Sequence, residues 1–179
     1  MLKYFSIILL MVVFACTKPK AALEVYFDLG SLLDEQAIGL LASQAKLEKK
    51  ISIGDQSETQ IFSPDSTQWV EQFELLKDFS PSSSLYVGAF EVTKLENEEV
   101  YLPKDSLKTP LKYFSVSENM EGRVITAESQ VEKGIYSDNK KMRIVFKRGV
   151  MDGYTVTGYQ KMMLKDTLRY TIEAKVISQ

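Results

Sequence analysis

Polar and apolar residues alternate along almost the whole second half of this chain, from Leu85 onwards. Alternation with period two is typical of β-strands, because successive side chains point to opposite faces of a sheet. The pattern is cleanest in 167–177, where every second residue from Leu168 to Val176 is apolar. Strands are therefore predicted at 85–92, 100–102, 111–117, 123–131, 141–147, 154–164 and 167–177.

Short polar segments separate these predicted strands. The pairs Asp138-Asn139 and Lys165-Asp166 are typical of tight hairpin turns, and the segment 149–153, which has a glycine at each end, fits a longer turn. Because the connections are short, we expect successive strands to pair as an antiparallel meander.

The N-terminal half begins with a predicted helix and a predicted hairpin. In 29–41, apolar residues recur at helical spacing, and either Asp28 or Ser31 could accept backbone N–H bonds as the N-cap. Two further strands are predicted at 47–53 and 56–62, joined by a turn at Gly54-Asp55.

A second helix is predicted directly after this hairpin. Ser63 can act as its N-cap and Pro64 as its first residue, where a missing N–H costs nothing. Apolar side chains then recur at i, i+4 and i+7, and they are Trp69, Phe73 and Leu76. Such a stripe should face the core. Together these patterns predict an α+β fold, in which two helices pack on a curved antiparallel β-meander.

The first residues have the layout of a secretory signal peptide. Lys3 supplies a positive charge, an apolar run follows over 4–14, and the small residue Ala15 precedes Cys16. The run is shorter than the roughly 20 residues that a transmembrane helix needs. An uncleaved anchor and an ordinary secreted protein with a chance cysteine are the alternatives.

The segment Val13-Phe14-Ala15-Cys16 resembles the lipobox of bacterial lipoproteins. The resemblance implies cleavage between Ala15 and Cys16 and a diacylglycerol on the sulfur of Cys16, with a fatty acid such as palmitate on its new amino group. Two or three acyl chains hold a protein stably on a bilayer. The expected organisation is a lipoprotein signal peptide at 1–15, a membrane tether at 16–22 and a single α+β domain at 23–179.

The residues after Cys16 carry information on location. Thr17, rather than an aspartate, follows the cysteine, which in lipoproteins of this kind resembles the pattern of outer-membrane proteins. No acidic residue precedes Glu24, so the acidic cluster that marks surface export in some Bacteroidota lipoproteins is absent. We therefore expect a protein anchored by lipid in the outer membrane and facing the periplasm.

Further segments are similar to a group of uncharacterised Bacteroidota lipoproteins. They are the C-terminal stretches 153–164 and 170–173, the opening Phe27-Asp28-Leu29, and the segment 63–79 with Trp69. This resemblance implies a lipid-anchored domain of helices and an antiparallel sheet. It brings no known activity, and no functional residue beyond Cys16.

Composition excludes several kinds of chemistry. The chain has no histidine and one cysteine, so Ser-His-Asp and Cys-His systems, histidine-containing metal sites, thiolate zinc clusters and an intrachain disulfide are all excluded. No phosphate-binding glycine motif occurs, and the net charge of -2 gives no drive toward nucleic acid. The oxygen-rich segment 96–99 lacks the ligand spacing of a calcium loop. No cofactor and no metal site are predicted.

Charged residues on two successive predicted strands form the candidate site. Acids occur at one strand and bases at the next, so opposite charges would meet if these strands pair. Such residues are usually the solvated face of a sheet, and the alternative is a charged docking face. The residues concerned are Glu128, Glu132, Lys141, Arg143 and Lys147.

Three functions are compatible with these patterns. The first is a non-enzymatic binding or scaffold domain, held on the membrane by acylated Cys16 and docking an envelope protein of unknown identity. The second is a carrier that holds a lipid or another amphiphile between sheet and helices, which a space filled by Trp69 and Phe73 would contradict. The third is a hydrolase that uses carboxylates alone. We expect the first, and hence no enzyme.

Overall fold

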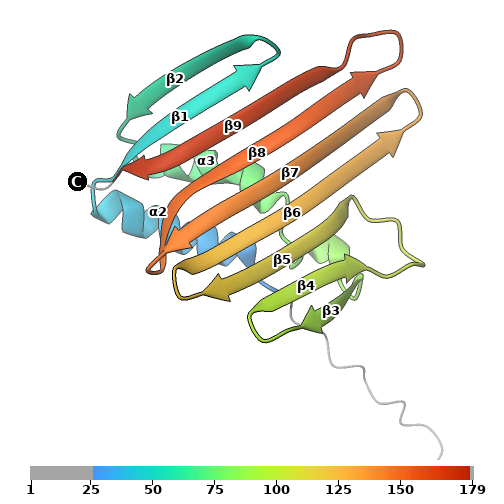
Figure 1. The fold of residues 1–179 in the computed structure, drawn as a ribbon, viewed down its shortest axis with the longest axis horizontal. Helices are drawn as coiled ribbons and strands as arrows, with labels where there is room; N and C mark the ends of the chain where they lie inside the picture. Colours follow the sequence, from blue (N-terminus) through green and yellow to red (C-terminus); the bar gives the residue numbers. More distant parts are fainter. Residues whose placement is uncertain (1–25, 178–179) are drawn as a thin grey trace, which may run out of the picture.

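The computed structural model describes residues 26–177, and Figure 1 shows the arrangement of their helices and strands. The helical elements are α2 (Leu29–Ala42), α3 (Ser66–Lys77) and a 3-10 turn, η2 (Ser84–Tyr86). The strands are β1 (Lys46–Ile53), β2 (Gln56–Phe62), β3 (Phe90–Lys94), β4 (Glu98–Pro103), β5 (Leu111–Asn119), β6 (Gly122–Lys133), β7 (Tyr136–Lys147), β8 (Val150–Met162) and β9 (Leu168–Ile177).

All nine strands belong to one open antiparallel sheet, in the order β2-β1-β9-β8-β7-β6-β5-β4-β3. From β3 to β9 each strand pairs with the next, which confirms the predicted meander. The N-terminal hairpin then joins the sheet through β1, which pairs along its whole length with β9. The predicted α+β class, with two helices on a curved antiparallel sheet, is therefore confirmed.

Both helices lie on the same side of the sheet, as Figure 1 shows, and leave the other side uncovered. The helix α3 turns Trp69, Phe73 and Leu76 inward, as the stripe in the sequence predicts, and all three are buried. They meet the apolar side chains on the inner face of the sheet, for example Ile144 and Val156. This layer is the core, and burial of these apolar side chains provides most of its stabilisation.

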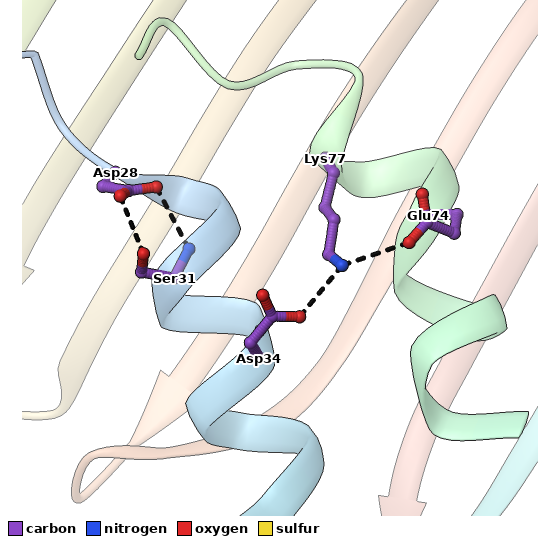
Figure 2. Close-up of polar contacts among 5 residues, drawn as sticks. All are labelled: Asp28, Ser31, Asp34, Glu74 and Lys77. Atoms are coloured by element: carbon purple, nitrogen blue, oxygen red, sulfur yellow. Dashed lines mark hydrogen bonds and ion pairs between the residues drawn. The ribbon is translucent and has the colours of Figure 1, made fainter. Parts of the chain in front are cut away.

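The structure identifies the N-cap residues of both helices. Asp28 caps α2: its Oδ1 accepts the Ser31 backbone N–H at 3.0 Å and its Oδ2 accepts the Ser31 hydroxyl at 2.7 Å (Figure 2). The cap of α3 is Asp65 and not Ser63, so the predicted start was two residues early. Asp65 is the cap because it forms a reciprocal capping box with Gln68. Ser63, two residues earlier, is outside the spacing that this motif requires.

One lysine links the two helices, as Figure 2 shows. The ammonium group of Lys77 lies 2.9 Å from a carboxylate oxygen of Asp34 on α2 and 3.1 Å from one of Glu74 on α3. The hydrogen bond to Asp34 raises the pKa of Lys77. This contact sits at the rim of the helical layer, with both acids exposed, so its contribution to stability is small.

Three local predictions in the strand half were wrong. The segment 85–92 is not one strand: Leu85 belongs to η2 and strand pairing starts at Phe90. The predicted turn Asp138-Asn139 lies inside β7, and the turn falls at Gly134-Ile135 instead. The segment 149–153 is not a long turn, since β8 already begins at Val150. In the last two cases long-range strand pairing overrides the local turn preference, whereas at 85–89 the alternating pattern is present without a partner strand.

Candidate functional site

The uncovered side of the sheet carries the charged residues predicted from the sequence. We call it the open face. Glu128 and Glu132 lie on β6 and Lys141, Arg143 and Lys147 lie on β7, and their register positions put all five on this face. The residues between them on β7, such as Ile144, point inward and are buried. The structure thus brings the predicted residues together on one surface.

One of the predicted acid–base contacts forms across the ladder. Glu128 is opposite Lys141, and the Lys141 ammonium lies 2.6 Å from a Glu128 carboxylate oxygen. Both side chains remain in contact with solvent. Because exposed pairs contribute at most about 1 kcal/mol, this contact orders the surface more than it stabilises the fold.

The other predicted residues do not pair with one another. Glu132 is opposite Ser137 and accepts a hydrogen bond from the Gln130 side chain at 2.8 Å. Lys147 instead contacts Asp152, a residue of β8, at 3.0 Å. Arg143 forms no ion pair with any other residue of 26–177.

A hollow of about 330 Å³ lies beside Arg143 on the open face. Its floor is formed by the side chains of Val145 and Thr155 and by the backbone at Gly153, Tyr154 and Ala174, since the side chains of the last two belong to the core on the other side of the sheet. Its rim is charged on all sides, by Glu48, Lys50, Arg143, Asp152, Glu173 and Lys175. Sequence reasoning missed this hollow because strands far apart in the sequence form it, and only their pairing brings β1 next to β9.

Gly153 keeps the floor of the hollow low. A Cβ built on this residue would overlap the backbone carbonyl oxygen of Ala174 on the neighbouring strand. The register of β7 against β8 also shifts between Val145 and Phe146, next to the glycine. A glycine inside a strand commonly marks such an irregularity or a close approach of two backbones. The structure therefore accounts for the glycine and for the depth of the hollow together.

The other side of the sheet has side chains where a carrier would need a cavity. Trp69 and Phe73 are both buried, and their ring centroids are 5.7 Å apart. Tyr154 lies in the same layer, and burial raises its pKa to about 12. This filling of the space between sheet and helices weighs against a lipid held there.

Asp138 is the one carboxylate in the buried class among residues 26–177. One of its oxygens lies 3.3 Å from the ammonium of Lys140, and the other, Oδ1, has no hydrogen-bond partner. A carboxylate hydrolase requires two acids around one substrate bond. The contact of Asp138 is with a lysine, so the paired-acid arrangement is not formed at this position.

The oxygen-rich segment 96–99 forms the turn between β3 and β4 and the start of β4. Glu99 lies 3.2 Å from the Lys94 ammonium and accepts a hydrogen bond from the Tyr101 hydroxyl at 2.8 Å. Burial and this bond raise the pKa of Tyr101. Within the part of the chain that the structure describes, no three acidic or cysteine side chains are grouped to hold a metal ion.

The lipobox-like segment, with Val13, Ala15 and Cys16, and the predicted tether at 16–22 lie outside the described residues. Within 26–177, no helix combines the length and the apolar character that crossing a bilayer requires. The proposed membrane attachment therefore depends on the sequence of the first twenty residues.

Comparison with known proteins yields no relative: no protein-family model, curated protein or solved structure matches this chain. Two features of the chain itself bear on function, the lipobox-like segment and the open face with its hollow. Of these, the open face is the one within the described residues.

Proposed function

We propose that this chain is a lipid-anchored lipoprotein of the bacterial envelope, attached through Cys16 to the periplasmic face of the outer membrane. Its folded part is a non-enzymatic binding or scaffold domain. The open face docks an envelope protein, with Arg143 and the hollow beside it at the centre of the contact.

The observation that carries this proposal is the uncovered face of a nine-stranded sheet, with a hollow whose floor is apolar and whose rim is charged. Interfaces between proteins commonly combine a small apolar centre with a polar rim. The filled space between sheet and helices supports the same choice, because it directs ligand binding to the outer surface.

The charges on the rim indicate what kind of partner fits. Lys50 lies 3.9 Å from Glu173 and Lys147 lies 3.0 Å from Asp152, so much of the rim is already balanced. Arg143, Lys175 and Glu48 of the rim form no ion pair within residues 26–177. Of the two cations, Arg143 has the planar guanidinium that favours a carboxylate held by two hydrogen bonds. A protein segment with an acidic side chain next to a small apolar one matches this surface better than a uniformly charged polymer.

The anchor is tested with Cys16→Ala in the native host. The wild-type protein should stay with membranes after a high-salt wash and carry the mass of a diacylglyceryl group and a fatty acid on Cys16. The variant should remain unprocessed or leave the membrane. Retention of the variant on washed membranes, with wild-type protein that has no added mass, would refute the anchor.

The docking face is tested with a photo-crosslinking residue placed at Thr155, on the floor of the hollow, and as a matched control at Glu71, an exposed position on α3. In intact cells, Thr155 should yield a defined adduct that Glu71 does not. Adding Arg143→Glu should reduce that adduct about tenfold, because losing a charge-assisted bond and adding repulsion costs more than 1.4 kcal/mol. Equal adducts at both positions, or no effect of Arg143→Glu, would count against this face.

A further inference from the structure

Two neighbouring hairpin turns at one end of the sheet carry exposed apolar side chains. The β6–β7 turn contains Ile135, and the β8–β9 turn begins with Met163 and Leu164. Figure 1 shows both turns at the same end of the sheet, away from α2 and α3. The turns touch, since the Met163 backbone N–H donates to the Ile135 carbonyl at 2.8 Å. We define the apolar tip as Ile135, Met162, Met163, Leu164 and Leu168.

Burial inside the domain accounts for only part of these side chains. Leu164 is 98% exposed, Ile135 66% and Met163 63%, whereas Met162 and Leu168 are each 47% exposed, so burial stabilises Leu164 least of the five. Single exposed apolar residues are common, but a contiguous group of them usually marks a surface that contacts another phase or molecule. Here three lie on two adjoining turns, and Met162 and Leu168 lie on the strand ends next to them.

The backbone at Leu164 gives a second, independent observation. Leu164 has φ of 64°, a left-handed conformation that costs a leucine free energy and a glycine almost none. Gly54, Gly134 and Gly149 take positive φ in other turns, as do the polar residues Gln44 and Arg148, so Leu164 is the one apolar side chain with a positive φ among residues 26–177. A leucine at this position is thus unfavourable for two reasons: its backbone is in the left-handed conformation, and its apolar side chain is exposed to water. A role outside the folded domain accounts for both.

Lysines outnumber acids next to the apolar tip along the chain. Lys133 ends β6, Lys161 precedes Met162 and Lys165 follows Leu164, while Asp166 is the one acid of the β8–β9 turn. None of these lysines forms an ion pair within residues 26–177. Exposed apolar side chains next to lysines are complementary to an anionic bilayer. The apolar groups enter the interface, and the ammonium groups bind lipid phosphates.

We propose that the apolar tip docks into the interfacial layer of an anionic membrane. Leu164 and Met163 enter the boundary of the acyl chains, and the lysines bind lipid headgroups. The proposal rests on the lipid anchor at Cys16, because the ten residue-to-residue steps from Cys16 to Tyr26 span at most about 35 Å and keep the domain near the surface. A contact too weak to hold a free protein then suffices, since the tether makes it intramolecular. The domain would have one fixed orientation on the membrane.

The test uses the full-length protein purified from its native host, with the modification state of Cys16 determined by mass spectrometry. The protein is reconstituted into vesicles of phosphatidylcholine alone and of phosphatidylcholine with phosphatidylglycerol. Hydrogen exchange is measured over 161–168. For wild type, exchange should be about tenfold slower in the anionic vesicles, because the turn enters the headgroup layer there. Leu164→Asn, which suits the left-handed backbone but is polar, should remove this difference between the two vesicles.

Two further measurements separate a membrane role from a structural one. Leu164→Asn should leave the melting temperature unchanged or raise it by about 2–4 °C, since backbone strain is relieved. The control is Met120→Ser, which changes a fully exposed methionine at the β5–β6 turn, next to Glu118 and Glu121. This variant should retain the wild-type difference between vesicles.

Each outcome has a distinct meaning. Equal exchange of wild type in both vesicles, with Cys16 acylated, would overturn the membrane contact and leave the anchor standing. Slower exchange in anionic vesicles with an unmodified Cys16 would refute the lipid anchor and support membrane docking by the apolar tip. Protection that is equal in both vesicles and increases with the surface density of protein would mark a second copy as the occupant, and would also overturn this proposal.

Discussion

Phe73→Ala tests whether the space between helices and sheet is a packed core or a ligand cavity. Phe73 is 1% exposed and packs on Trp69, so truncation leaves a hole that the fixed sheet below it cannot close. Replacing a fully buried phenylalanine by alanine costs about 3–5 kcal/mol, the transfer free energy of the ring plus the cost of the cavity. That is a large part of the stability of a typical domain.

Urea unfolding followed by fluorescence is the assay. Trp69 is the only tryptophan in the sequence and lies against the substituted ring, so its emission reports on this layer. With an m-value of about 2 kcal/mol per molar, the unfolding midpoint should fall by roughly 1.5–2.5 M with little change in m. The control is Val70→Ala on the same helix, where the side chain is largely exposed and the expected change is within about 0.5 kcal/mol.

One result would refute this reasoning. If Phe73→Ala lowers the free energy of unfolding by less than about 1 kcal/mol, the ring does not fill a packed core. A midpoint that then rises when an amphiphile is added to the variant, and also to the wild type, would restore the carrier hypothesis.

Two further predictions concern the backbone. Asp28→Ala should lower the free energy of unfolding by about 1 kcal/mol, because it removes the N-cap of α2. Hydrogen bonding from the Ser31 backbone lowers the pKa of Asp28, so the difference from wild type is present above a pH of about 3.9 and disappears as the pH falls through the lower folded pKa. Unfolding curves at several pH values measure this dependence. Gly122→Ala should lower the free energy of unfolding by about 2 kcal/mol or more, since φ is 149° and the new Cβ would overlap the carbonyl oxygen of Phe146. The same change at Gly39, inside α2 and with open space around it, should raise the free energy of unfolding by about 0.5–1 kcal/mol. Thermal unfolding of the two variants tests both predictions.

Local pattern was enough to predict most of the elements. Alternation placed strands such as β7 because one face of the strand lies on the core and the other in water, the arrangement that makes period two visible. The stripe of Trp69, Phe73 and Leu76 placed α3 for the same reason, with period 3.6. The two-residue alternation of side chains along a strand was sufficient to place the five charged residues of the candidate site on one face.

The failures arise where a distant part of the chain decides. Asp138 has the character of a turn residue, but β6 and β8 pair on both sides of it and hold it in a strand, where it is buried beside Lys140. Gly153 has the same character and forms the floor of the hollow. Nothing in the local sequence gives the pairing of β1 with β9, and without that pairing neither the hollow nor the sheet order can be derived.

The pairing of β1 with β9 also constrains when this domain can form. The strand β9 lies between β8 and β1 and bonds to both, yet it is made after every other strand. A chain emerging from a ribosome therefore has no place for its N-terminal hairpin until residues 168–177 arrive, so the sheet cannot close early around a partial product. The export proposed for this chain requires an unfolded polypeptide, and a sheet that cannot form before its last strand is made would meet that requirement by topology.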